Sequence, residues 1–134
     1  LSDADKSTAV AGTEWAEFDR SAIARHISIG QVVFVDVTAD WCLTCKANKA
    51  LVLDRDPVVS RLRGSGVIAM QADWTRPSET ISRYLESFGR YGIPFNAVYG
   101  PGAPDGVVLP ELLSSEAVLE ALSDAGSGRD AAPQ

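Results

Sequence analysis

The stretch QVVFVDVTADWCLTCKANKALVL, residues 31–53, gives the strongest indication of how this chain folds. Its first part, residues 31–37, is a β-branched and aromatic run, which is typical of a central strand buried on both faces. After a short turn, the residues from 42 to about 53 have a helical pattern. The sequence therefore predicts a buried strand followed by a helix, and it places Cys42 and Cys45 in the first turn of that helix.

On both sides of this stretch the hydrophobic pattern alternates between helix and strand. A short strand near the start of the chain completes the pattern, and the alternation implies parallel strands joined by crossover helices. The last two strands are joined by a glycine- and proline-rich turn, so they should add an antiparallel edge. We expect the other helices at residues 19–29, 57–63, 78–91 and 114–125, and the other strands at residues 67–72, 95–99 and 107–109. The prediction is an α/β fold with a central mixed sheet flanked by helices.

Short local signals predict where some of these elements end. Asp56 is expected to cap the short helix, with Pro57 in its first position. Gly92 is expected to stop the helix at 78–91. The tripeptide Ala-Asp-Trp occurs at 39–41 and again at 72–74, each time just past a strand. Both turns should therefore lie at the same edge of a parallel sheet.

Length and charge narrow the class of protein. The chain has 134 residues, enough for one domain with its own core. Its net charge of −6 argues against nucleic acid or an anionic membrane surface as partner, because both attract basic patches.

No apolar run is long enough to span a bilayer, so we expect a soluble domain. Residues 1–8 lack a signal peptide's apolar core. The chain opens with Leu1 rather than Met, so we expect a mature form or an excised fragment. The folded domain is expected at residues 13–125, between a flexible segment at 1–12 and a disordered tail at 126–134.

The two cysteines carry the chemistry that the sequence predicts. A helix N-terminus presents unpaired N–H groups and a partial positive charge, which stabilise a thiolate there. Cys42 sits at such a position, and Cys45 lies about one turn further on the same face, close enough to close a disulfide. We expect Cys42 to be the exposed nucleophile and Cys45 the shielded thiol that resolves the mixed disulfide.

Two metal sites are alternatives to this chemistry. Zinc usually takes four cysteine or histidine ligands, and besides the cysteine pair this chain offers only His26. Copper(I) tolerates two thiolates, so a copper-binding module stays open as an alternative function. We assign no metal and no cofactor to the site.

Asp36 lies in the apolar strand, six residues before Cys42. A carboxylate in such a run should be desolvated, with a raised pKa, and it could take the proton that Cys45 loses on attack. A solvated acid near the end of the strand is the alternative.

The segment from Ile93 to Phe95 opens a later strand, and together with Trp41 it is expected to contact the partner. Proline cannot donate to a strand ladder, so Pro94 belongs at a strand start. If the Ile93–Pro94 bond is cis, the backbone of Ile93 could pair with an extended partner segment. An ordinary trans proline is the alternative that the residues alone favour.

The segments VFVDVTADWCLTCKANKALVL at 33–53 and GIPFNAVYGPG at 92–102 resemble one known family. It is the C-terminal periplasmic domain of the DsbD family of transmembrane thiol–disulfide interchange proteins, including its ScsB-type branch. The resemblance covers roughly residues 15–125. It implies a thioredoxin-like fold located in the bacterial periplasm, as part of an inner-membrane protein.

The same resemblance implies roles for residues and partners. Cys42 would be the nucleophile, Cys45 the resolving thiol, Asp36 the buried acid and Pro94 a cis-proline. The domain would accept electrons from a membrane-embedded domain of the same polypeptide. It would pass them to periplasmic thioredoxin-like or other disulfide-containing proteins, and so act as a protein-disulfide reductase.

Two positions depart from the family pattern, and the pair between the cysteines bears on the direction of exchange. Lys49 stands where members often have a glutamate, and Phe95 stands where many thioredoxins have a threonine. Leu43-Thr44, between the cysteines, carries no charge, whereas strong oxidants stabilise the reduced thiolate, for instance with a histidine there. The pair favours a reductase, and an oxidase or isomerase on the same fold is the alternative.

Overall fold

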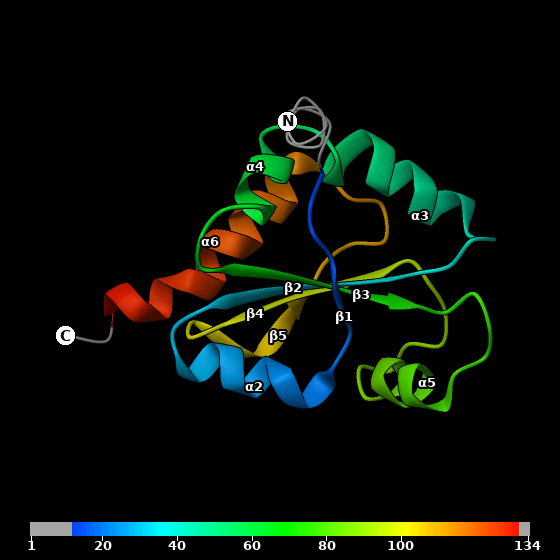
Figure 1. The fold of residues 1–134 in the computed structure, drawn as a ribbon, viewed down its shortest axis with the longest axis horizontal. Coiled ribbons are helices and arrows are strands. Elements are labelled where there is room, and N and C mark those ends of the chain that lie inside the picture. The colour runs from blue at the N-terminus through cyan, green and yellow to red at the C-terminus, as the bar shows by residue number, and fades with distance from the viewer. Residues whose placement is uncertain (1–11, 132–134) are drawn as a thin grey trace, which may run out of the picture.

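A mixed five-stranded sheet with strand order β1-β3-β2-β4-β5 forms the centre of the molecule (Figure 1). The computed structural model describes residues 12–131, so most of the expected flexible N-terminal segment and the last three residues of the expected tail lie outside the described residues. The sheet is built from β1 (Ala16–Glu17), β2 (Val32–Thr38), β3 (Val67–Asp73), β4 (Phe95–Gly100) and β5 (Ala103–Val108).

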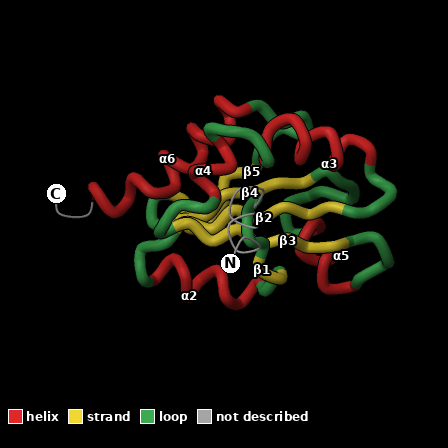
Figure 2. Tube along the Cα trace, turned by 45° about the horizontal axis from the view of Figure 1, so that its top comes forward, coloured by secondary structure: helices red, strands yellow, loops and turns green. Residues whose placement is uncertain are grey.

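Helices cover both faces of the sheet. They are α2 (Arg20–Ser28), α3 (Leu43–Asn48), the π-helix η1 (Lys49–Leu53), α4 (Val58–Leu62), α5 (Glu79–Glu86) and α6 (Ser115–Ala131). Figure 2 shows α2 and α5 on one face and α3, α4 and α6 on the other. The predicted α/β fold, a mixed sheet flanked by helices, is confirmed.

Strand β2 separates two hydrophobic cores, as expected of a strand buried on both faces. Side chains alternate across a strand, so Val33, Val35 and Val37 pack toward α2 and α5. Val32 and Phe34 pack toward η1, α4 and α6. By the same alternation Asp36 lies on the Phe34 face, which is the side that carries α3 and η1.

The strand directions depart from the predicted crossover pattern at β4. Strands β2 and β3 are parallel, from Val32 opposite Val67 to Thr38 opposite Asp73. Strand β4 runs antiparallel to β2, with Phe95 opposite Val37. The connection through α5 therefore does not return the chain to the other end of the sheet, and β4 starts at the edge where β3 ends.

The two Ala-Asp-Trp turns lie at one edge of the sheet, as predicted. Val37 is in register with Ala72 in the parallel pair β2–β3. The backbone N–H of Trp74 donates to the Thr38 carbonyl at 2.7 Å, which ties the ends of the two strands together. The turn before Cys42 is thus fixed against the turn that follows β3.

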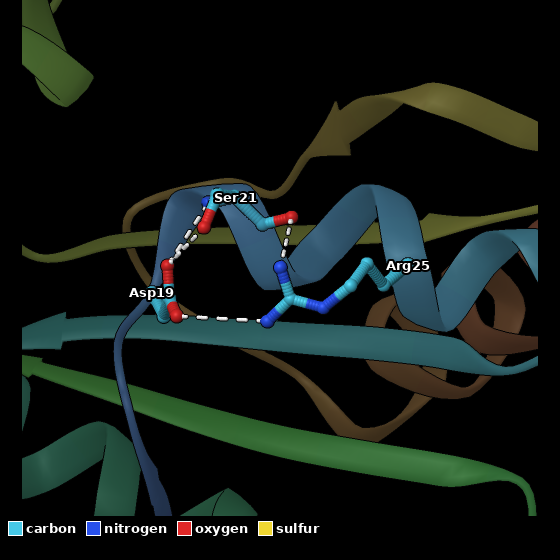
Figure 3. Close-up of polar contacts among 3 residues, drawn as sticks. All are labelled: Asp19, Ser21 and Arg25. Atoms are coloured by element: carbon cyan, nitrogen blue, oxygen red, sulfur yellow. Dashed lines mark hydrogen bonds and ion pairs between the residues drawn. The ribbon is translucent and has the colours of Figure 1, made fainter.

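Helix α2 begins close to the expected start at residue 19, and Asp19 is its N-cap. The Asp19 carboxylate accepts hydrogen bonds from the Ser21 backbone N–H at 3.1 Å and from the Ser21 hydroxyl at 2.7 Å (Figure 3). Arg25, one turn later, approaches the same carboxylate at 3.8 Å. The bond from the Ser21 N–H satisfies one of the N–H groups that a helix start leaves open.

Two helix boundaries differ from the prediction. Helix α5 ends at Glu86, not at residue 91, because the chain turns at Gly89 with φ of +72°, and the Arg90 N–H closes back onto the Leu85 carbonyl at 3.0 Å. Pro57 is the N-cap of α4 and not its first helical residue.

The last hairpin and helix differ from the prediction as well. Strand β5 begins at Ala103, so the turn is much shorter than the expected 100–106. A Cβ at Gly100 would lie only 2.4 Å from the Ala125 carbonyl oxygen, so glycine lets α6 pack closely on β4. Helix α6 runs to Ala131, through residues expected in a disordered tail.

Candidate active site

Cys42 and Cys45 are joined by a disulfide at the start of α3 (Cα–Cα 5.2 Å). Cys42 is the N-cap residue, with extended backbone dihedral angles of −94° and 102°. Its Sγ accepts a hydrogen bond from the Cys45 backbone N–H at 3.1 Å. This places one sulfur where the unpaired N–H groups and the positive end of the helix dipole can stabilise a thiolate.

The predicted difference in exposure between the two cysteines is not found. Cys42 is 6% exposed and Cys45 is 5% exposed, so both are buried in the disulfide form. They form a small apolar cluster with Ala39, against which Ile93 packs. What distinguishes the two sulfurs is therefore their position on α3, the first at the cap and the second one turn inside.

Hydrogen bonds from the β3–α5 loop hold the turn before Cys42 in place. The Asp40 N–H donates to the Thr75 hydroxyl at 2.8 Å, and the Trp41 indole N–H donates to the Thr75 carbonyl at 3.1 Å. Thr75 is itself held by Asp73, and these bonds hold the pKa of the Asp73 carboxyl below its usual range. Trp41 stays 59% exposed beside the disulfide.

Asn48 anchors the other end of α3, and the sequence pattern did not single it out. It is buried, its side-chain N–H donates to the Glu111 carbonyl at 2.8 Å, and its side-chain oxygen accepts from the Leu113 N–H at 3.0 Å. The β5–α6 loop has no regular partner for these backbone groups, so a buried asparagine supplies one. A polar residue on an otherwise apolar helix face was the available sign.

Asp36 is buried, with 6% of its surface exposed. Burial raises the pKa of Asp36 to about 6, because water no longer solvates the charged form. Hydrogen bonds from Asn96 and Gln71 and the positive charge of Lys49 pull in the opposite direction. The alternative of a solvated acid at the strand end is excluded by this burial.

Asn96 is a further residue of this site that the sequence pattern missed. It lies opposite Asp36 in the β2–β4 ladder, and its side-chain N–H donates to the Asp36 carboxylate at 2.8 Å. On the other side of Asp36, Gln71 occupies the corresponding position of β3. Two amide side chains thus flank the carboxylate along the sheet, a neighbourhood that only strand pairing creates.

A groove of about 500 Å³ adjoins the disulfide. Trp41 precedes Cys42, and Ile93 packs against the cysteine pair, so both connect the groove to the sulfurs. Pro94 is buried at the start of β4, and the Ile93–Pro94 peptide bond is cis. The groove is lined by Trp41, Trp74, Thr75, Pro77, Ser82, Tyr91, Gly92 and Ile93.

Phe95 does not face this groove, and its expected contact with a partner is a misassignment. Its side chain is 1% exposed and packs in the core beneath α5. Its ring meets Tyr84 edge-on at 5.6 Å and Phe88 at 5.2 Å. Sequence order placed Phe95 beside Pro94, but strand alternation turns its side chain to the α5 face.

Neither a cluster of metal-ligating side chains nor a membrane-spanning helix is found within the described residues. Residues 12–131 hold no cluster of three or more histidine, cysteine, aspartate or glutamate side chains suited to a metal ion. His26 lies on α2 and pairs through Nδ1 with the Gln31 side chain at 2.7 Å. None of the helices that the structure describes is both long and apolar enough to cross a bilayer.

A disulfide at the N-terminus of a helix that follows the central strand of this sheet defines a thiol–disulfide oxidoreductase-type domain. The family model for thioredoxin-like proteins matches residues 14–101, and the chain belongs to this family. The predicted thioredoxin-like fold is thereby confirmed.

Two thiol:disulfide interchange proteins are similar in sequence to part of this chain. The chain is 32% identical over 78 residues to the thiol:disulfide interchange protein DsbD of Pseudoalteromonas atlantica, covering 58% of this chain and 13% of that protein. It is 31% identical over 75 residues to DsbD of Vibrio cholerae, covering 56% of this chain and 12% of that protein. The match thus spans a small fraction of each relative.

Among solved structures, the C-terminal domain of Neisseria meningitidis DsbD in its oxidised form is similar, with a TM-score of 0.64. The identity is 20%, and the match covers 82% of this chain and 99% of that chain. This likeness shows the fold. Together with the two relatives it confirms the resemblance to DsbD that the sequence motifs indicated.

Proposed function

We propose that this domain is a protein-disulfide reductase that cycles between the Cys42–Cys45 disulfide and its dithiol. In the dithiol form the Cys42 thiolate attacks a partner disulfide, forms a mixed disulfide and expels one partner thiolate. Cys45 then attacks the Cys42 sulfur, which restores the disulfide and releases the second partner thiolate. Two electrons and two protons pass to the partner, and a donor dithiol must return them. The observation that carries the proposal is a closed disulfide at a helix N-terminus.

The position of each sulfur supports the order of attack. Cys42 caps α3, where backbone N–H groups favour its thiolate, and it adjoins the exposed Trp41. Cys45 lies within the first turn and is the sulfur that a bound partner leaves free to attack. Both are buried in the disulfide form, so Cys42 is the nucleophile because of its electrostatic position and not because of a large difference in exposure.

Asp36 is proposed to take the proton from Cys45. The Cys45 thiol gives its proton to the Asp36 carboxylate, and the resulting thiolate attacks the mixed disulfide. Asp36 lies on the Phe34 face of β2, the side of the sheet on which Figure 2 shows α3. Its pKa near 6 leaves it mostly ionised at neutral pH. A proton acceptor works best when its pKa lies close to the working pH, and this carboxylate meets that condition.

The groove beside the disulfide is proposed to hold the partner segment. Trp41 and Tyr91, which are 59% and 78% exposed, provide apolar rims, and Ile93 reaches from the groove to the cysteine pair. An extended segment that carries the partner's disulfide would lie across this surface. Pro94 shapes the chain beneath it.

The likeness to DsbD supports a place for the domain in a longer pathway. We propose that a membrane-embedded domain, of the same polypeptide, reduces Cys42–Cys45. We propose further that the domain works in the periplasm and passes electrons to thioredoxin-like or other disulfide-containing proteins there.

Trapping of mixed disulfides tests the central proposal. Cys45→Ser should accumulate mixed disulfides with a model disulfide protein, because attack by Cys42 still occurs and resolution does not. Cys42→Ser should accumulate few. Gel analysis after alkylation measures both, and equal trapping by the two variants would overturn the assignment of the nucleophile.

A further inference from the structure

Asn96 is a buried polar side chain in a strand that is otherwise apolar. Every residue of β4 is buried, and Asn96 is 1% exposed. An amide in such a place lowers stability unless it is hydrogen-bonded. Its side-chain N–H donates to the Asp36 carboxylate at 2.8 Å, so the buried amide has a hydrogen-bond partner.

We infer that Asn96 is a positioning residue for the exchange reaction, holding the Asp36 carboxylate ionised and oriented to accept the Cys45 proton. The inference rests on the proposed function of Asp36. The antiparallel register places Asn96 directly opposite Asp36, so the hydrogen bond is built into the pairing of β2 and β4. The side-chain amide of Asn96 carries no charge and does not act as an acid or a base near neutral pH. It therefore acts through Asp36.

The other groups around Asp36 decide the direction of the effect. Burial raises its pKa most strongly, and the negative charge of Asp54, which follows η1, adds to this. The hydrogen bond from Asn96 is the largest opposing influence, followed by Gln71 from β3 and the charge of Lys49 from η1. Without Asn96, burial would be opposed less, and the Asp36 carboxyl should hold its proton to a higher pH.

Direct titration of Asp36 tests the inference independently of any enzymatic activity. In the oxidised protein the cysteines do not titrate, so ¹³C NMR of the Asp36 carboxyl reports on that group. Asn96→Leu removes the donor at similar volume, and we expect the pKa of Asp36 to rise by about one unit or more. Val98→Ala is the matched control, since Val98 lies two residues further on the same buried face of β4. It should lower stability without moving the pKa of Asp36.

The rate of resolution provides the second readout. The acid limb of its pH profile should move upward with the pKa in Asn96→Leu, so that resolution slows at pH 6–7 and recovers at higher pH. Asn96→Ser, which can still donate a hydrogen bond, should restore part of the shift and serves as the test if the leucine variant does not fold. In an Asp36→Asn background the Asn96 change should add nothing.

The outcomes separate the inference from the function on which it rests. An unchanged pKa of Asp36 in both Asn96 variants would overturn the positioning role. A raised pKa with an unmoved pH profile would overturn the coupling of Asn96 to resolution. If Asp36→Asn leaves resolution unchanged, then the proton-acceptor role of Asp36 fails, and the positioning role fails with it. A lack of exchange in the unmodified protein would overturn the proposed function itself.

Discussion

At the scale of single residues, one carboxyl group, that of Asp36, is buried in the strand that precedes the cysteines. Asp36 has lost most of its water, and burial raises its pKa to about 6, whereas its ordinary value is 3.8. Such a carboxylate binds a proton more tightly in the folded chain than in the unfolded chain. Its ionisation therefore costs stability.

The stability of the oxidised protein should fall as the pH rises from about 4 to about 6. Over this window the folded state holds a proton on Asp36 that the unfolded state has already released, so stability falls with pH and then levels off. Asp36→Asn should remove about 2–3 kcal/mol of this loss and be the more stable protein at pH 7. Urea unfolding at pH 4 and pH 7 measures the difference. Asp105→Asn, an exposed position on β5, is the control, and an equal pH response of all three proteins would contradict the burial argument.

Asp36→Asn should also slow release of the mixed disulfide more than its formation. Proton transfer of this kind contributes about 10²- to 10⁴-fold in rate, and formation needs no proton from Cys45. Stopped-flow measurement of the two steps separates them. Unchanged resolution with Asp36→Asn would leave the buried acid without a role in exchange.

At the scale of elements, the helix that carries the cysteines is held at both ends by parts of the chain distant in sequence. Thr75 binds the turn before Cys42, and Asn48 binds the loop before α6. Helix α3 has only six residues before the π-helix begins, so its own hydrogen bonds give it little independent stability. Its orientation over the sheet therefore depends on these outside contacts.

Asn48→Leu should destabilise the protein by about 2–3 kcal/mol. The change leaves the buried Leu113 N–H without its side-chain partner and also removes the partner of the partly buried Glu111 carbonyl. Leucine cannot replace either bond. Urea unfolding and amide exchange at Leu113 measure the loss. Lys46→Gln, an exposed change on the same helix, should stay within about 0.5 kcal/mol, and a comparable loss there would argue against the anchoring role.

At the scale of the whole molecule, the sheet brings the redox pair, the buried acid and the groove to one end. The parallel pair β2–β3 sets Cys42 beside the Thr75 loop, and the antiparallel β4 brings Ile93 and Asn96 to the same place. The direction of electron flow depends on the balance of the dithiol and disulfide states in this setting.

A reduction potential of roughly −200 to −270 mV is expected from equilibration with glutathione. No charged side chain lies between the cysteines to stabilise the thiolate form, so the site should be a reductant. A value of about −120 mV would support an oxidase in place of the reductase. Metal analysis of the reduced protein in the same series would reveal tightly held copper(I), which would favour the copper-binding alternative.

The order of the elements and the candidate redox pair Cys42 and Cys45 could be read from the chain alone. These depend on local patterns: the continuous apolar run of β2 and the spacing of Cys42 and Cys45. The same local reasoning predicted that Asp36 is desolvated, because the residues on both sides of it in the strand are valines.

The neighbours of each of these residues, by contrast, follow from the way the chain folds. The reversed direction of β4 sets Asn96 against Asp36 and turns Phe95 into the core, and neither follows from neighbours in the chain. The near-equal burial of the two cysteines and the anchoring of α3 by Asn48 likewise depend on loops distant in sequence. Pairing and packing bring together residues far apart in the chain, and a local pattern carries no information about which ones will meet.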